Sequence, residues 1–194
     1  MTENKSPEVS GRAFLGLLKY IKGWGDQEKL DGIIEGAGAS AKPIFAERIR
    51  VTGWYPYDGY KDFLIAIDRK LGKGDYRYCR ELGVVAGQRD MGTIFKIYTL
   101  MANADRLIGA CNKFWQSYYR NAGTMEAIQS SAEQTVLRIK GFPTMHPTHC
   151  KLMEGWISAT MDSVGFRILE IKETQCTSRG GDFHDYTFRW QKKK

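Results

Sequence analysis

The chain has 194 residues and a formal net charge of +7, with 42% hydrophobic and 26% charged residues. This composition is typical of one globular domain with its own core, and it excludes fibrous and low-complexity classes. The first twelve residues hold no apolar stretch of the kind that a secretion signal contains, and no apolar run approaches the roughly 20 residues of a membrane-spanning helix. We therefore expect a cytoplasmic protein with reduced cysteines, because thiols there bind metals more often than they form disulfides.

The positive charge does not by itself indicate a nucleic-acid partner. Basic residues are scattered along the chain, and the one dense cluster is the end, RWQKKK. No basic helix and no aromatic RNA-binding motif accompanies this cluster. We expect no nucleic-acid binding, and we interpret residues 191–194 as a basic tail.

The first half of the sequence predicts helices. Residues 1–10 are polar and lack periodicity, so we expect them to be disordered. Beyond them, apolar residues recur every three or four positions in successive stretches. The expected helices span residues 11–22, 26–35, 58–71, 75–91, 92–101 and 105–119.

From residue 124 the apolar pattern changes to alternation, which is typical of strands. A helix over 150–164, ended by Gly165, interrupts the strands. The expected strands span residues 124–131, 133–142, 166–174 and 183–190. The sequence thus predicts an α+β fold, with N-terminal helices packed on an antiparallel sheet of about four strands with one inserted helix. A single domain would cover residues 11–190.

Four side chains near the C-terminus have the spacing of a metal site: C150-x22-E173-x2-C176-x7-H184. Cys176 and His184 flank a polar, glycine-containing loop, and a hairpin closed by it would place them opposite each other. Cys150 lies in the first turn of the expected helix, where the helix dipole favours a thiolate. Two thiolates, one imidazole and one carboxylate form a closed ligand set for zinc, and four protein ligands indicate a structural role.

The ligand set is left open at Glu173. Side chains three residues apart on a straight strand point to opposite faces, so Glu173 can join Cys176 only if the chain bends near 174–175. His146 and His149 could each replace Glu173 in the ligand shell. The alternative without a metal is a set of buried free cysteines and an ordinary strand histidine.

The stretch from Cys150 to Trp190 resembles the 4-vinyl reductase domain. It has a Cys at the start of a helix, a Gly at the helix end, a strand, a second Cys, a Gly-Asp loop and a final aromatic strand. Sensor domains of phenol-responsive transcription activators in this superfamily carry a zinc site with the order Cys, Glu, Cys, Cys. Cys150, Glu173 and Cys176 match that order, and His184 stands at the last Cys.

The upstream half is similar to short stand-alone members of the same superfamily, whose function is unknown. The shared features are a GWYP turn at 53–56, an RELG helix at 80–83 and the paired Tyr118 and Tyr119. The resemblance implies a ligand-binding fold shared with haem-based nitric-oxide sensors and vesicle-tethering subunits. In that fold the ligand lies in an apolar pocket between helices and sheet, and homodimers are usual.

The leading functional hypothesis is a sensor or carrier for an apolar or aromatic small molecule, with a structural zinc site. A binding pocket needs apolar walls and a few polar anchors, and the central helices are dense in aromatic residues. The expected ligand-binding residues are Phe95, Tyr98, Phe114, Trp115, Tyr118 and Glu154. A sensor of this kind would signal through a protein partner. The alternative is that these rings fill the core.

Two other classes of function stay open. One is a protein-interaction or tethering adaptor, and the other is an accessory to a tetrapyrrole reductase. The sequence contains no nucleotide-binding glycine loop, nucleophile elbow or metalloprotease motif that would support catalysis, so enzymatic activity is not expected. Haem is also not expected, because all three histidines lie at or beyond position 146, away from the central helices.

Overall fold

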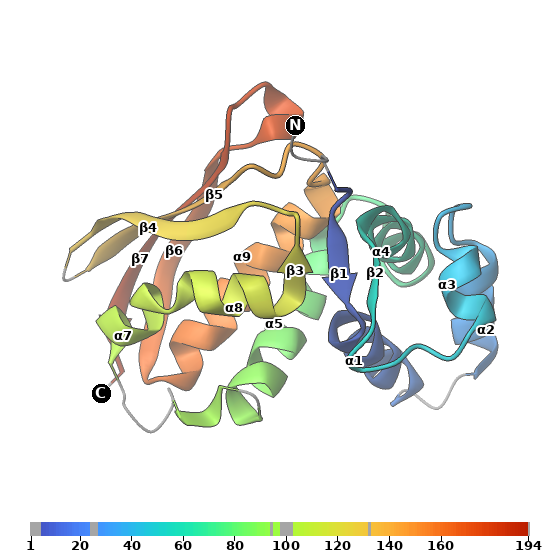
Figure 1. The fold of residues 1–194 in the computed structure, drawn as a ribbon. Coiled ribbons are helices and arrows are strands. Elements are labelled where there is room, and N and C mark those ends of the chain that lie inside the picture. Colours follow the sequence, from blue (N-terminus) through green and yellow to red (C-terminus); the bar gives the residue numbers. More distant parts are fainter. Residues whose placement is uncertain (1–4, 24–26, 94, 98–102, 132, 194) are drawn as a thin grey trace.

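The computed structural model describes residues 5–23, 27–93, 95–97, 103–131 and 133–193. The expected α+β fold is confirmed (Figure 1). The helices are α1 (Gly11–Lys22), α2 (Gln27–Glu35), α3 (Lys42–Ala46), α4 (Tyr57–Leu71), α5 (Arg77–Gly92), α7 (Ala104–Gly109), α8 (Cys111–Tyr118) and α9 (Pro147–Ser163). Half of the expected helix over 92–101 lies outside the described residues. No helix among the described residues is long and apolar enough to cross a membrane.

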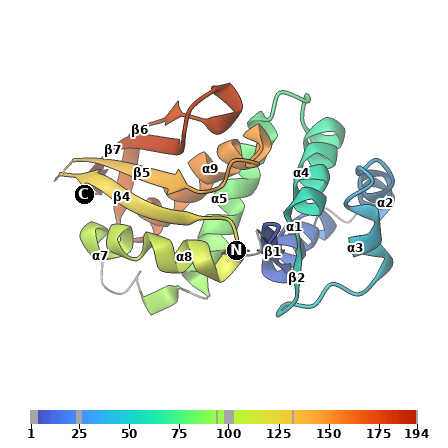
Figure 2. The ribbon, with the colours of Figure 1, turned by 45° about the horizontal axis from the view of Figure 1, so that its top comes forward.

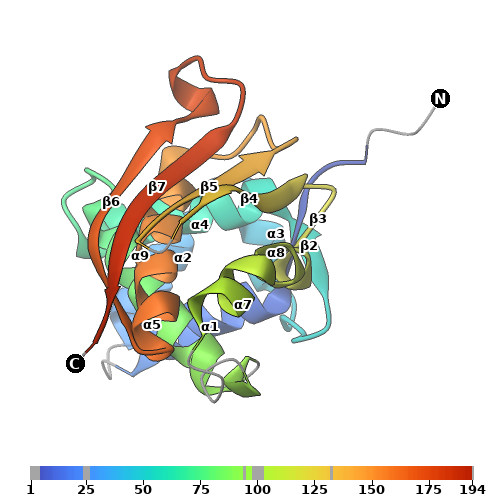
Figure 3. The ribbon, with the colours of Figure 1, turned by 90° about the vertical axis from the view of Figure 1, so that its left-hand side faces the viewer.

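The main sheet has four antiparallel strands in the order β4-β5-β7-β6. Its strands are β4 (Thr124–Ser130), β5 (Gln134–Lys140), β6 (Phe166–Gln175) and β7 (His184–Lys192). The buried side chains of Leu137, Ile139, Tyr186 and Phe188 alternate along β5 and β7 with more polar positions, as the period of a strand requires. Helices α8 and α9 lie against the sheet (Figure 3).

Residues 8–10, which lie in the stretch expected to be disordered, form a strand of a second, three-stranded sheet. β1 (Glu8–Ser10) pairs with both β2 (Trp54–Pro56) and β3 (Tyr119–Arg120). The strand was not evident from the sequence because its pairing partners lie more than 40 residues away, and three residues carry too little pattern. Residues 1–4 lie outside the described part of the chain.

Helices α5 and α9 pack together at the centre of the molecule, between the main sheet and the N-terminal helices α1–α4 (Figure 2). Glycines permit the close approach. A Cβ at Gly83 of α5 would overlap the carbonyl oxygen of Leu152, and one at Gly155 of α9 would overlap that of Arg80. This contact fixes the position of α9, which begins beside the C-terminal hairpin and continues past the central helices.

Candidate metal centre and ligand pocket

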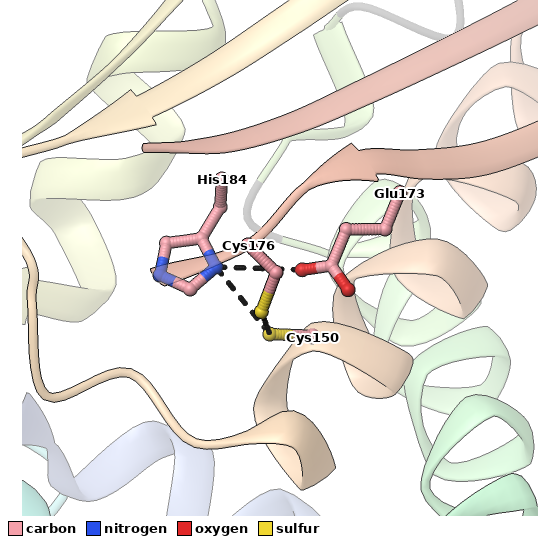
Figure 4. A group of neighbouring side chains, drawn as sticks. All are labelled: Cys150, Glu173, Cys176 and His184. Atoms are coloured by element: carbon pink, nitrogen blue, oxygen red, sulfur yellow. Dashed lines mark hydrogen bonds and ion pairs between the residues drawn. The ribbon is translucent and has the colours of Figure 1, made fainter. Parts of the chain in front are cut away.

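The structure brings Cys150, Glu173, Cys176 and His184 together, with one ligand atom from each lying within 4.8 Å of all the others (Figure 4). Cys150 comes from the first turns of α9, Glu173 from the end of β6, and His184 from the start of β7. The bend that Glu173 requires is present, because the register between β6 and β7 shifts between Glu173 and Gln175. This bulge turns Glu173 toward the same side as Cys176.

Three of the distances between these atoms have the size of tetrahedral edges. The two sulfurs are 3.8 Å apart, Cys150 Sγ is 3.5 Å from His184 Nδ1, and that nitrogen is 3.4 Å from Glu173 Oε1. Bonds of ~2.3 Å to sulfur and ~2.0 Å to nitrogen or oxygen give edges of about 3.8, 3.5 and 3.3 Å. These three distances therefore match three of the six edges of a tetrahedral site, and all four atoms lie within 4.8 Å of one another.

Neighbouring groups orient the four side chains. His184 Nε2 lies 2.9 Å from the hydroxyl of Thr177, which in turn donates to the carbonyl of Pro143. If Nε2 carries the ring proton and donates it to Thr177, the lone pair of Nδ1 faces the cluster, as metal-binding histidines require. Arg179 donates to Glu173 Oε2 at 2.9 Å and leaves Oε1 toward His184.

The electrostatics of the cluster match a cation site. Burial raises the pKa of the Cys150 thiol, and the nearby Glu173 carboxylate and Cys176 raise it further. Burial also raises the pKa of Glu173, but hydrogen bonds from His184 and Cys150 and the charge of Arg179 outweigh it, so the net shift is downward. The raised pKa keeps the Cys150 thiol protonated beside the ionised Glu173 carboxylate. A positive ion between them would favour the thiolate, because its charge offsets both negative groups.

The two other histidines do not join the cluster. His146 caps α9, its Nδ1 accepting the Thr148 backbone N–H at 3.3 Å. His149 is buried against Trp115, with ring centroids 5.9 Å apart, and its Nδ1 lies 3.2 Å from the Tyr57 hydroxyl. Burial lowers the pKa of His149 to about 3, so this ring is neutral.

A separate pocket lies among the central helices. Its walls come from α1, α4, α5, α8, α9 and Tyr119 of β3, and among the described residues of the main sheet only Met125 contributes. It encloses about 600 Å³ between protein atoms, including its opening to solvent, of which about 40 Å³ is wide enough for the centre of a water molecule. That space holds a few waters, since each needs roughly 10–15 Å³ by this measure. A larger ligand enters only if lining side chains move apart.

Three of the expected ligand-binding residues line this pocket: Phe114, Trp115 and Tyr118. Phe95 packs on Phe114 behind the lining, with ring centroids 4.3 Å apart. Glu154 lies in a different groove, where it pairs with Lys151 at 2.6 Å. Tyr98 lies outside the described residues.

Sequence reasoning missed the polar part of the pocket. Asp90, almost fully buried, accepts hydrogen bonds from Arg89, Tyr118 and Trp156, and all four residues line the pocket. The only sequence signal was a charged pair, Arg89 and Asp90, near the end of a helix whose neighbouring turns are apolar. That signal is weak, because charged pairs at helix ends are usually exposed.

No protein-family model matches the sequence, and no curated protein is similar enough to count as a relative. Solved structures of H-NOX proteins share the fold. The Fe(II) unliganded H-NOX protein from K. algicida aligns with a TM-score of 0.70 at 9% identity, over 94% of this chain and 97% of that one. The S. oneidensis H-NOX protein in the Fe(II)NO state aligns with a TM-score of 0.63 at 13% identity, over 94% and 99%.

A third structure, from work on heme distortion in the H-NOX family, aligns with a TM-score of 0.53 at 11% identity, over 95% of each chain. At identities this low, the structural alignments show that the chain shares the fold of these H-NOX proteins.

These findings correct the expectation about cofactors. The proteins that share the fold are described with Fe(II) or heme, so the conclusion that haem is unlikely was wrong. It rested on the absence of histidine from the central helices, which is not sufficient, because tyrosine and methionine also ligate haem iron. The comparisons show nothing about zinc.

Proposed function

We propose that the chain is a small-molecule sensor or carrier domain of the 4-vinyl reductase type. It would contain a structural zinc site and bind an apolar ligand among its central helices. The observation that carries the zinc site is the agreement of three interatomic distances with tetrahedral edges. The shared fold of the H-NOX proteins supports the role in sensing. A reducing, cytoplasmic compartment would keep both thiols available for the ion.

The role of the zinc would be structural. Cys150, Glu173, Cys176 and His184 fill four positions and leave none for a substrate or a reactive water. The ion would join α9 to the β6–β7 hairpin. Leu152, Met153 and Trp156, which follow Cys150 on α9, line the pocket. The ion would therefore also hold one pocket wall in place.

Once lining side chains move apart, the residue types of the pocket are suited to a haem or another flat tetrapyrrole as well as to a simpler aromatic molecule. The lining includes tyrosines and methionines, which are side chains that ligate haem iron in proteins, and one cation, Arg89. When bound, a haem would supply a site for a diatomic gas. Phe114 and Trp115 would contact the faces or edges of any such ring system.

Elemental analysis and native mass spectrometry of protein purified without chelators test the zinc site. We expect about one zinc per chain, and less than about a tenth of an equivalent would contradict the site. A thermal-shift screen against phenols, haem and other tetrapyrroles, and lipids tests the pocket. A chain that binds none of these would contradict the role in sensing.

We further propose a homodimer or a stable protein partner, supported by the edge of the main sheet. β6 is an edge strand, and its Leu169 side chain is 50% exposed. Edge strands offer unpaired backbone groups to another chain. Light scattering of the wild type and of Leu169→Lys tests this, and a wild type that stays monomeric at 100-fold dilution and at high concentration alike would contradict a homodimer.

A further inference from the structure

The hydroxyl of Tyr186 is buried and has no hydrogen-bond partner in the described part of the chain. The whole residue is 0% exposed. A buried hydroxyl that bonds to nothing lowers stability, so native proteins keep few of them, and those that persist need a reason, such as a bound ion. The Tyr186 hydroxyl can therefore still donate one hydrogen bond.

Strand geometry places Tyr186 beside the metal cluster. It follows His184 by two residues on β7, so both side chains point to the same face of the sheet. On the neighbouring strand β6, its register partner is Glu173, and the side chains of paired residues also share a face. Tyr186 is thus next to two of the four proposed zinc ligands, on the face where α9 supplies a third, Cys150.

The two sulfurs of the cluster differ in their hydrogen bonds. Cys176 Sγ lies 3.0 Å from the hydroxyl of Ser178, which can donate to it. In the described part of the chain, the hydrogen-bonding contacts of Cys150 Sγ go to Cys176 Sγ at 3.8 Å and His184 Nδ1 at 3.5 Å, and both of these atoms would bind the ion themselves. A cysteine that binds a metal is a thiolate, which only accepts hydrogen bonds. Cys150 would therefore need a donor from outside the cluster.

The charge of the cluster also favours such a donor. Two thiolates and one carboxylate carry three negative charges against the two positive charges of zinc. Arg179 offsets the excess at Glu173, and its side chain is 58% exposed, so this compensation comes from the solvent side. Burial raises the pKa of Tyr186 well above its ordinary value, and the neighbouring Cys150 and Glu173 raise it further, so the hydroxyl keeps its proton. Tyr186 is thus a neutral donor on the buried side, close to Cys150.

We propose that Tyr186 is a positioning residue of the metal centre, whose hydroxyl donates a hydrogen bond to the Cys150 thiolate when zinc is bound. This inference rests on the proposed zinc site and adds a hydrogen-bond donor to it. Each thiolate would then accept from one hydroxyl, Cys176 from Ser178 and Cys150 from Tyr186. Hydrogen bonds to a coordinating sulfur tune both the affinity of a metal site and the energy of the sulfur electrons.

Tyr186→Phe tests this hydrogen bond, because it keeps the ring and removes only the hydroxyl. Competition with a chromophoric chelator should show a zinc affinity about tenfold weaker than that of the wild type. Thr124→Val is the matched control. It removes another buried hydroxyl without a partner among the described residues, on β4, which β5 separates from β7. This control should bind zinc as tightly as the wild type does.

Cobalt(II) in place of zinc adds a measurement that a loss of packing alone would not change. The sulfur-to-cobalt charge-transfer absorption should move to longer wavelength in Tyr186→Phe, because a thiolate that loses a hydrogen bond gives up its electrons more readily. It should stay in place in Thr124→Val. If the wild type and Tyr186→Phe share the same zinc affinity and the same absorption, or if the affinity falls while the absorption stays, the role of Tyr186 is overturned and the zinc site stands. If the wild type binds neither ion, the zinc site and this inference are overturned together.

Discussion

The four-residue cluster and the central pocket use buried polar groups in opposite ways. In the cluster, four ligand atoms lie within 4.8 Å of one another, and the outward-facing Nε2 of His184 and Oε2 of Glu173 have protein partners in Thr177 and Arg179. In the pocket, the hydroxyls of Tyr60 and Tyr119 make no hydrogen bond to another described residue, and neither counts among the fully buried polar atoms without a partner. The first site, as proposed, would be completed by a single ion, whereas the second keeps polar groups open to the contents of the pocket.

The two sites also differ in what they do for the fold. A metal bound only by the folded chain adds its binding free energy to stability. A ligand in the pocket adds stability only in proportion to its concentration and affinity. Helix α9 joins them, because Cys150 near its start belongs to the cluster and Trp156 belongs to the pocket.

Removing one thiolate should give the largest effect. Cys176→Ser takes away a zinc ligand, and we expect the variant to lose its metal and at least about 5 kcal/mol of unfolding free energy. For a chain of this length that corresponds to a fall in Tm of roughly 10–20 °C. Elemental analysis and thermal denaturation measure the two quantities on the same sample.

Cys111→Ser is the control for this change. Cys111 is also buried, and its Sγ donates to the Met125 carbonyl at 3.2 Å, a bond that serine can replace. This variant should keep its zinc and most of its Tm. Equal losses in both variants would show that the cluster is no different from an ordinary buried cysteine.

Disturbing the contact between α9 and α5 should give the next largest loss of stability, and it should affect the cluster and the pocket together. In Gly155→Ala, the added Cβ would overlap the Arg80 carbonyl oxygen, a backbone atom that cannot rotate away. We expect a loss of about 3 kcal/mol from overpacking, together with weaker ligand binding, measured by denaturant unfolding and by titration.

Gly109→Ala provides the comparison, because its Cβ would meet nothing within 4 Å. That variant should be neutral or slightly stabilised, since alanine favours helices. A neutral Gly155→Ala would mean that the two helices do not need this close contact.

The cluster could be predicted from the sequence because its ligands lie within 35 residues and two of them flank one hairpin loop. The register of that hairpin follows from alternation in two adjacent strands, and the bend at Glu173 could be stated as a condition. What the sequence left open was the choice between Glu173 and the histidines of HPTHC. That choice depends on Tyr57 and Trp115, which are distant in sequence and hold His149 away.

The pocket could not be predicted to the same degree. Its lining runs from Ala13 to Trp156 and comes from six or more elements. An aromatic residue on a central helix has the same pattern whether it lines a cavity or fills the core, so Phe95 and Phe114 looked alike. The short β1 strand and the buried Asp90 were missed for a related reason, since both are defined by partners far along the chain.

Substituting Tyr118 and Tyr60 tests whether the two pocket hydroxyls contribute differently to stability. Tyr118 donates to Asp90 at 2.8 Å, so Tyr118→Phe removes a buried hydrogen bond to a charged group and should cost about 2 kcal/mol. Tyr60→Phe removes a hydroxyl that makes no hydrogen bond to another described residue, and it should change the unfolding free energy by less than about 0.5 kcal/mol. Chemical denaturation of the ligand-free protein measures both, and equal costs would contradict an unpartnered Tyr60.

An effect smaller than the loss expected for Tyr118→Phe should come from the group that orients the imidazole. Thr177→Val keeps the shape of the side chain but removes the hydroxyl that His184 Nε2 contacts at 2.9 Å. The ring then loses the bond that presents Nδ1 to the ion, and zinc affinity should fall by roughly tenfold, about 1.4 kcal/mol, while the four ligands remain. Competition with a chromophoric chelator measures this affinity. Thr187→Val, whose hydroxyl lies on the other face of the hairpin beside Thr174, should leave it unchanged. If zinc binds equally well to the wild type, Thr177→Val and Thr187→Val, the orientation of His184 comes from packing alone. The hydrogen bond to Thr177 would then contribute nothing to the difference between the cluster and the pocket.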